Sequence, residues 1–244
     1  MTREAVLADT FVQLADTLID DFDVVDLLTL LADRSVEVLD ADAAGTVLAA
    51  PDGHLHVVAV SSQAVRVLEL FELQAEEGPS LDAYRTGTAI VAEDLTTFES
   101  HWPRFARRAL AAGFRSLHAV PMCLRGATIG VLNLFRAEQH RADGEEVQIA
   151  EAFASVATIA ILQHRARLEA QAINEQLSHA LNSRVVIEQA KGMLSERLGV
   201  SIGQAFEALR RHARNHNRRL AEVAAEVING TIDTSALRTP RRRT

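Results

Sequence analysis

Apolar residues recur along this chain at two spacings, and the change of spacing separates helical from extended segments. Near the start, Phe11, Leu14 and Leu18 follow the three- and four-residue repeat of a helix, until the acidic run 20–23 interrupts it. Beyond this run, short apolar stretches bounded by turn residues predict strands, with helical stretches between them. The helices expected are 24–38, 64–73, 80–86 and 102–113, and the strands are 46–50, 55–60, 89–91, 116–124 and 128–135.

A much longer helical pattern follows the last of these strands. It runs from Asp143 to about Arg197 without a proline, and its first glycine is Gly192. At 1.5 Å per residue this stretch makes about 80 Å of helix, which is too long for one helix to shelter its apolar face alone. The pattern therefore predicts a homodimer paired through this stalk. Candidate residues for the seam are Ile159, Leu162, Leu168, Ile173, Leu177 and Leu181.

Two shorter amphipathic helices complete the pattern. The first begins at a capping box formed by Ser201 and Gln204, and the second covers about 220–228 and stops at Asn229–Gly230. Short helices are marginal on their own, so these two must fold against the end of the long helix. The sequence thus predicts an α+β sandwich, built on an antiparallel sheet flanked by helices, followed by a helical stalk and an all-α three-helix bundle.

The sandwich carries a family resemblance. Pro79, Thr86–Gly87 and Trp102–Pro103, together with the closing hairpin Val120–Phe135, resemble a GAF domain over about residues 22–165. The resemblance implies a sensing module whose cavity lies between the sheet and the short helices. Candidate lining residues are Tyr84, Trp102, Phe105, Phe114, His118 and Met122. The alternative is that these side chains simply fill the core.

The ligand of such a cavity is not readable from the sequence. The lysine-containing signature of cyclic-nucleotide-binding relatives is absent, because no lysine precedes Lys191. Cys123 is the only cysteine and lies on an expected strand, which argues against a bilin thioether, a disulfide cycle or a zinc cluster. His54, His56, His101 and His118 show no metal-ligand spacing. We therefore expect no metal and no resident cofactor, while a small-molecule ligand remains open.

Charge divides the chain into two parts of opposite sign. The net charge of −8 combines a net −13 over residues 1–170 with a net +5 over residues 171–244. This polarity suits a protein whose second part meets a polyanion, although solvated helix faces would give the same count. The stretch 183–194, with Ala205–Phe206, Leu209–Arg210 and the final helix, resembles an ANTAR domain over about 168–232, in a combined regulator of the actinobacterial type.

The ANTAR resemblance implies binding to RNA hairpins in nascent transcripts, which prevents termination and lets RNA polymerase continue. Lys191 is the only lysine among 25 basic residues, so its retention suggests a place where a compact ammonium is needed. Carried over by position, the expected RNA-binding residues are Arg184, Lys191, Arg210, Arg211, Arg214, Asn217 and Arg218. Ion pairs such as Arg184 with Glu188, or Arg210 with Glu207, are the structural alternative.

Four segments are therefore expected: an N-terminal helix (1–21), a GAF sensor (22–165), an ANTAR domain with its stalk (166–232) and a disordered basic tail (233–244). No phosphate loop, catalytic triad or metal spacing predicts an enzyme. No leader or membrane-spanning run is evident, which predicts a cytoplasmic protein. A signal-controlled DNA-binding regulator and a protein-binding scaffold remain alternatives to the RNA-binding regulator.

Overall fold

The computed structural model describes residues 3–16, 22–232 and Leu237. The chain divides into two compact units, unit 1 (Met1–Ala166) and unit 2 (Arg167–Thr244). Two expectations fall outside the described residues: Leu18 of the first helix, and the basic tail 233–244 apart from Leu237.

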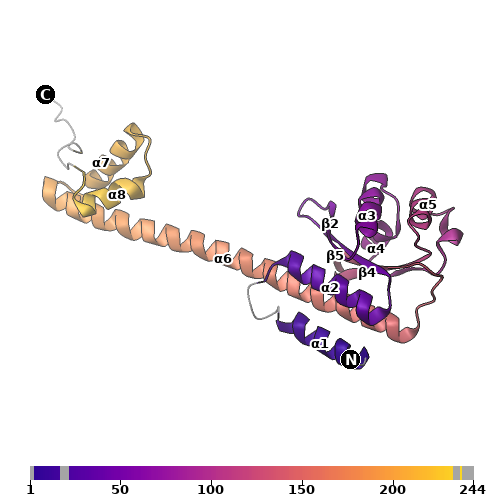
Figure 1. The fold of residues 1–244 in the computed structure, drawn as a ribbon. Helices are drawn as coiled ribbons and strands as arrows, with labels where there is room; N and C mark the ends of the chain where they lie inside the picture. The colour runs from indigo at the N-terminus through magenta and orange to yellow at the C-terminus, as the bar shows by residue number, and fades with distance from the viewer. Residues whose placement is uncertain (1–2, 17–21, 233–236, 238–244) are drawn as a thin grey trace. The chain divides into compact units, whose positions relative to one another are not determined.

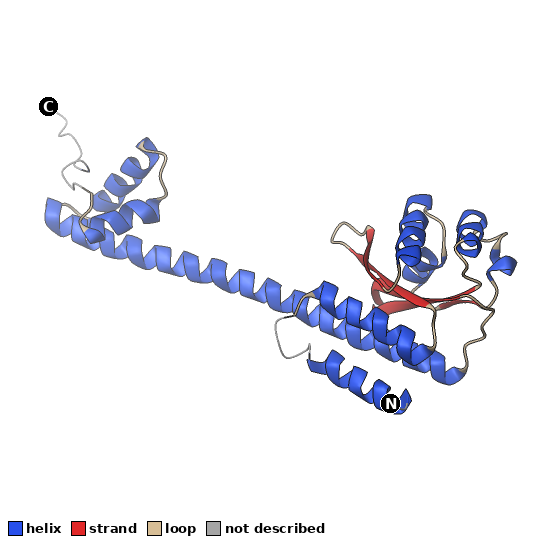
Figure 2. Cartoon of the chain, in the orientation of Figure 1, coloured by secondary structure: helices blue, strands red, loops and turns tan. Residues whose placement is uncertain are grey.

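A five-stranded antiparallel sheet forms the centre of unit 1, with strand order β2-β1-β5-β4-β3 (Figures 1 and 2). All four neighbouring pairs are antiparallel, so the predicted sheet type is confirmed. The strands are β1 (Ala43–Ala49), β2 (Leu55–Val60), β3 (Ile90–Ala92), β4 (Ser116–Leu124) and β5 (Ala127–Arg136).

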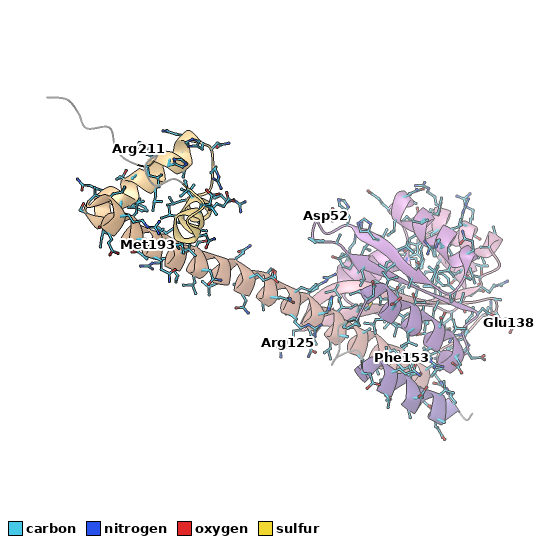
Figure 3. All side chains as sticks on the ribbon, turned by 60° about the vertical axis from the view of Figure 1, so that its left-hand side comes forward. Asp52, Arg125, Glu138, Phe153, Met193 and Arg211 are labelled. Carbon is cyan, nitrogen blue, oxygen red and sulfur yellow. The ribbon has the colours of Figure 1, made fainter. Side chains whose placement is uncertain are left out.

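Helices cover both faces of this sheet (Figure 1). α2 and the first part of α6 pack on one face, and α1 lies against these helices. Phe11 of α1 meets Phe153 of α6, which is labelled in Figure 3, edge to face with 5.4 Å between ring centroids. Short helices pack on the other face. The helices of unit 1 are α1 (Arg3–Asp16), α2 (Val24–Leu39), α3 (Gln63–Ala75), α4 (Pro79–Thr86), the 3-10 helix η1 (Leu95–Phe98), α5 (Pro103–Ala111) and α6 (Gly144–Leu198), whose last part belongs to unit 2.

The first strand begins three residues earlier than its apolar pattern predicts. Ala43, Ala44 and Gly45 are small, so they give a weak hydrophobic signal, yet all three are buried on β1. Gly45 is required there, because a Cβ at this position would lie 2.2 Å from Oε1 of Glu69 on α3. The missing side chain thus lets α3 approach the sheet closely.

Two helices on this face are capped at their N-termini by carboxylates from α3 or from the residues just after it. α4 and α5 both begin with proline, and neither receives a cap from its own preceding side chain. Glu72 Oε1 accepts the backbone N–H of Ser80 at 2.7 Å in α4. Glu77, just after α3, accepts the backbone N–H of Arg104 at 2.6 Å in α5. Carboxylates near the end of α3 therefore fix the starts of both following helices.

Unit 2 consists of the last part of α6 with α7 (Ile202–Asn215) and α8 (Leu220–Asn229). The predicted capping box is present: Ser201 Oγ accepts from Gln204 N at 3.2 Å, and Ser201 N donates to Gln204 Oε1 at 3.0 Å. The three helices share a core of small and branched apolar side chains. Its buried members include Ala190, Leu194, Ala205, Leu209, Ala213, Val223 and Val227.

Candidate functional sites

The ammonium group of Lys191 makes its contacts within unit 2. Its Nζ donates to Oε1 and Oε2 of Glu188 at 2.8 and 2.9 Å, and it lies 5.3 Å from the centroid of the Phe206 ring on α7. The side chain is only 17% exposed. The stem therefore packs at the edge of the core, as a residue flanking an apolar stripe should, while the charge joins α6 to α7.

Arg184 lies about two turns before Lys191 on α6, and its environment differs from that of Lys191. Its side chain is exposed, and within the described part of the chain it forms no ion pair. The alternative pair of Arg184 with Glu188 is not formed, because Glu188 holds Lys191 instead. Arg184 therefore presents an uncompensated guanidinium to solvent.

A basic hollow of about 410 Å³ lies between the end of α7 and the start of α8. Four of the sequence-selected residues line it, and Ala213 and Leu220 add an apolar part to its wall. Asn217 adopts a left-handed backbone conformation (φ 51°), and Arg218 N donates to Ala213 O at 2.8 Å, so the connection between the helices turns tightly without a glycine. The selected residues are Arg210, Arg214, Asn217 and Arg218.

The arginines of the hollow differ in how firmly they are held. Arg218 makes two hydrogen bonds to the carboxylate of Glu226, at 2.6 and 2.8 Å, which fixes the plane of its guanidinium. These bonds raise the pKa of Arg218 and lower the pKa of Glu226. Arg210 has a looser contact of 3.6 Å with Glu207, and Arg214 has no ion-pair partner among the described residues.

Arg184 and Lys191 on α6 do not line the hollow, and Arg211 is the selected residue of α7 that does not line it either. It is half-buried on α7 (Figure 3), and its Nη2 donates to Leu237 O at 3.1 Å. Next to the hollow, the rings of His212 and His216 stack with centroids 4.0 Å apart. Burial lowers the pKa of His212, and the neighbouring His216 lowers it further.

The six candidate lining residues of unit 1 do not share one cavity. Tyr84, Trp102, Phe105 and Phe114 join the apolar cluster between the sheet and the short helices. His118 and Met122 lie on the opposite face, because side chains two apart on β4 share a face and Met122 packs in the cluster under α2 and α6. Treating them as one set ignored this strand alternation.

The aromatic group on the short-helix side is tied down by hydrogen bonding. Trp102 Nε1 donates to Asp82 Oδ2 at 2.9 Å, and the Trp102 ring stacks on Phe98 at 5.0 Å. His101 reaches the same carboxylate oxygen at 3.2 Å. These contacts join α4 to α5 and leave Trp102 only 3% exposed, so the aromatic side chains fill space as a core does.

His118 is buried beside a charged network on the α6 side. Burial lowers its pKa to about 4, and the positive charge of Arg136 acts in the same direction. Arg136 donates to Leu39 O at 2.7 Å and lies 3.6 Å from Glu146. His140 also meets Glu146, at 2.8 Å. His118 is therefore a neutral imidazole at neutral pH, and Arg136 fastens β5 to the end of α2.

Sequence reasoning missed two buried carboxyl groups on α3, Glu69 and Glu72, which are 0% and 1% exposed. Desolvation raises the pKa of Glu69 to about 8 and that of Glu72 to about 7. A signal was available in the spacing: the buried apolar residues Val65 and Leu68 place these glutamates at i+4 and i+7 from Val65, on the apolar face of the helix.

Across the part of the chain that the structure describes, no three His, Cys, Asp or Glu side chains are grouped to hold a metal ion. Cys123 is half-buried and free on β4. Among the described residues, α6 alone has the length and apolar content to cross a membrane, and a single such helix is weak evidence for a span, because a helix of a protein core can have the same length and composition.

Solved structures share the fold of unit 1. The GAF domain of a phosphoenolpyruvate-protein phosphotransferase from Acinetobacter is 13% identical, with a TM-score of 0.52 over 68% of this chain and 97% of its own. A free methionine-R-sulfoxide reductase from Neisseria meningitidis is 18% identical, with a TM-score of 0.53 over 68% and 95%. At this identity the likeness concerns the fold alone, and curated protein sequences give no match.

Family models match both parts of the chain. The ANTAR domain model matches residues 175–228, within unit 2, which holds the basic hollow. The GAF domain model matches residues 23–162, which is more than half of the sequence. The chain therefore belongs to the GAF domain family and carries an ANTAR domain after its GAF domain.

Proposed function

We propose that this protein is a signal-responsive RNA-binding regulator that binds hairpins in nascent transcripts and prevents termination. The observation that carries the proposal is the basic hollow of unit 2, lined by Arg210, Arg214 and Arg218 within the segment that matches the ANTAR model. The acidic GAF unit supplies the sensing part, and the basic unit supplies the output.

The chemistry of the hollow suits an RNA loop. A hairpin loop offers phosphates together with unstacked bases, and arginine can contact either one. Glu226 fixes the plane of the Arg218 guanidinium, while Arg214 is exposed and provides a cation without an ion-pair partner among the described residues. Leu220 gives the hollow an apolar patch against which a base can pack. A loop nucleotide would thus meet stacking, charge and hydrogen-bond donors in one place.

The other residues selected from the sequence are expected to contribute to RNA binding to different extents. Arg184 is exposed without an ion-pair partner among the described residues and extends the RNA face along α6. Lys191 can reach a phosphate only by giving up its contacts to Glu188, so its contribution is smaller. Arg211 acts indirectly, because its side chain is turned toward Leu237.

We infer that the regulator acts as a homodimer. Leu177 and Leu181 are each 57% exposed and Ile173 is 61% exposed on α6, and with Ala166 and Ala170 they recur at spacings of four, three, four and four residues. Ala166 to Leu177 and Ala170 to Leu181 are each eleven residues, a repeat that favours nearly straight or slightly right-handed pairing. A second copy would cover this stripe.

One residue of the expected seam leaves this stripe. Leu168 lies about 140° around the helix from Ile173, at about 100° per residue, so one partner helix does not cover both. Sedimentation of the intact protein and of a Leu177→Glu variant tests the assembly. We expect a dimer for the intact protein and a shift toward monomer for the variant, and a monomer at tens of micromolar with intact Leu177 would contradict the inference.

The decisive functional experiment compares nucleic acids. Filter binding of the full-length protein to labelled RNA hairpins, with duplex DNA of equal length as the competitor, should show preference for the hairpin. Transcription by RNA polymerase past a terminator that overlaps such a hairpin should then increase when the protein is added. Preference for duplex DNA would support the DNA-binding alternative, and no binding to either would favour a protein-binding scaffold. The expected place of action is the cytoplasm, where transcripts are made.

A further inference from the structure

Glu69 reaches from α3 to the middle of the sheet and meets one amide there. Asn133 Nδ2 on β5 donates to Glu69 Oε1 at 3.0 Å, and both residues are 0% exposed. Gly45 on β1 is the direct neighbour of Asn133 in the sheet, and its missing side chain makes room for the carboxyl group. The contact is therefore built into the fold, with a glycine, an amide and a carboxyl from three elements.

This contact leaves two buried oxygen atoms without a hydrogen-bond partner among the described residues: Oε2 of Glu69 and Oδ1 of Asn133. Both are acceptors when Glu69 is ionised, so neither can satisfy the other. Leaving both buried oxygen atoms without a hydrogen bond destabilises the folded protein. A proton on Glu69 Oε2 supplies the missing donor. The resulting O–H donates to Asn133 Oδ1, while Asn133 Nδ2 still donates to Glu69 Oε1. One proton then satisfies both orphaned atoms in a cyclic acid–amide pair.

We propose that Glu69 and Asn133 form a proton-binding site, in which a neutral Glu69 is held by two hydrogen bonds to the amide of Asn133 and fastens α3 to β5. The proton comes from solvent and returns to it, so that the packing of α3 on the sheet depends on proton activity. The site is independent of the RNA interface, and it is assigned by the geometry of unit 1 alone.

The charges around the pair favour a single proton on Glu69. Burial raises the pKa of Glu69 to about 8, and the negative charge of Glu72, one turn along α3, raises it as well. The hydrogen bond from Asn133 and, more weakly, the charge of Arg66 on the same helix oppose this shift, and β1 and β5 contribute no charged group at the contact, only Gly45 and Asn133. The carboxyl groups of Glu69 and Glu72 titrate as an interacting pair.

Glu72 is the member of the pair that loses its proton first as pH rises. It accepts hydrogen bonds from Ser80 N at 2.7 Å, Ser80 Oγ at 2.8 Å and Leu81 N at 3.4 Å at the start of α4, and only the carboxylate can serve all of these donors. Burial and Asp82 raise its pKa to about 7. The neutral acid therefore holds α3 to the sheet, and the carboxylate holds α4 to α3.

Infrared spectroscopy of the full-length protein tests the site without RNA. A protonated carboxyl group has a carbonyl band that a carboxylate lacks. At about pH 7.5 we expect such a band in the intact protein, mainly from Glu69, its loss by about pH 9.5, and its reduction in Glu69→Gln to a minor remainder from Glu72. Glu99→Gln, which makes the same change at an exposed position, is the matched control and should keep the band.

Stability provides a second readout. In Glu69→Gln the new amide can donate to Asn133 Oδ1 without a titrating proton, so this variant should fold. A folded-state pKa above that of the unfolded chain means that stability falls as pH rises, and for a pKa of about 8 the folding constant falls by about fivefold between pH 7 and 8. Glu69→Gln should lose this dependence and Glu99→Gln should retain it.

The proposal can be overturned in two ways. A protein without a protonated carboxyl band at about pH 7.5 would show that Glu69 is ionised and the pair does not bind a proton. Equal pH dependence of stability in Glu69→Gln and Glu99→Gln between pH 7 and 8 would show that the titrating group is elsewhere. If Glu69→Gln failed to fold, titration of the carbonyl band in the intact protein would still decide between the two outcomes.

Discussion

The arginines of the two units show how the same side chain serves a fold in one place and a partner in another. Arg136 in unit 1 has a side chain that is 7% exposed, and it is surrounded by Leu39 O, Asp40 O and Glu146. Arg210 in unit 2 is 47% exposed and has one loose contact, to Glu207. A cation whose donors are met internally organises packing, whereas a cation at the rim of a hollow is available to an anion from outside.

The comparison predicts its largest effect at Arg136. Replacement by alanine leaves Glu146 and two backbone carbonyl groups with fewer partners in a mostly buried site. We expect the free energy of unfolding to fall by about 3–5 kcal/mol, measured by chemical denaturation. Arg141→Ala is the control, because its side chain is 87% exposed and its loss should change stability by less than about 0.5 kcal/mol. Equal losses of unfolding free energy in Arg136→Ala and Arg141→Ala would show that Arg136 does not organise the packing of unit 1.

The second prediction concerns His118 beside Arg136. Its folded-state pKa of about 4 lies below the ordinary value of 6.5, so the unfolded chain binds the proton first as pH falls. Stability from this residue is therefore present above pH 6.5 and is lost between 6.5 and 4, by about 3 kcal/mol in total. His118→Leu should flatten this part of the pH–stability curve, while His54→Leu, at an exposed turn, should retain it. An unchanged curve in His118→Leu would contradict the assignment.

The third prediction addresses the hollow of unit 2. Replacing Arg210 and Arg214 together by glutamine should lower hairpin affinity by about 100-fold, because two charge-assisted contacts are lost. The slope of log affinity against log salt should decrease by somewhat under two units. Thermal unfolding should be nearly unchanged, since both side chains are exposed. The control is Arg141→Gln in unit 1, and a similar loss of affinity there would indicate non-specific attraction.

The sequence predicted the elements of the fold well where periodicity was strong. The closing hairpin, the long helix and the Ser201–Gln204 capping box are all confirmed, because each depends on local spacing. Strand β1 was placed too late, since Ala43–Gly45 has little apolar character and its burial is imposed by α3. The approach of α3 to β1 cannot be predicted from the local pattern of apolar residues.

The candidate sites were less predictable, because they depend on which faces meet. Four basic or polar residues of α7 and the following turn were selected from helical position and resemblance, and they line one hollow. His118 and Met122 were grouped with residues across the sheet, although strand alternation separates them. Glu69 was overlooked, since its partner Asn133 is 64 residues away and a charged residue is normally assigned to the surface.

We expect the smallest loss of hairpin affinity at Lys191. Comparing this residue with Arg214 tests whether a cation with an internal partner contributes less to RNA binding than one with no ion-pair partner among the described residues. The sequence suggested a leading role for this lone lysine, but its ammonium already contacts Glu188 and the Phe206 ring. A phosphate must compete with both contacts, so the gain on binding RNA is small. We expect Lys191→Met, which keeps most of the apolar stem, to lower hairpin affinity by less than about fivefold, against at least tenfold for Arg214→Met.

The two methionine variants form a matched pair, because each removes one cation and retains an unbranched side chain. Filter binding at several salt concentrations should show a reduced salt slope for Arg214→Met and an almost unchanged slope for Lys191→Met. A charge that neutralises a phosphate in the complex contributes to the slope, whereas a charge that stays with Glu188 does not. If Lys191→Met instead lost affinity and slope as strongly as Arg214→Met, Lys191 would leave Glu188 on binding, and the RNA face would centre on α6 rather than on the hollow.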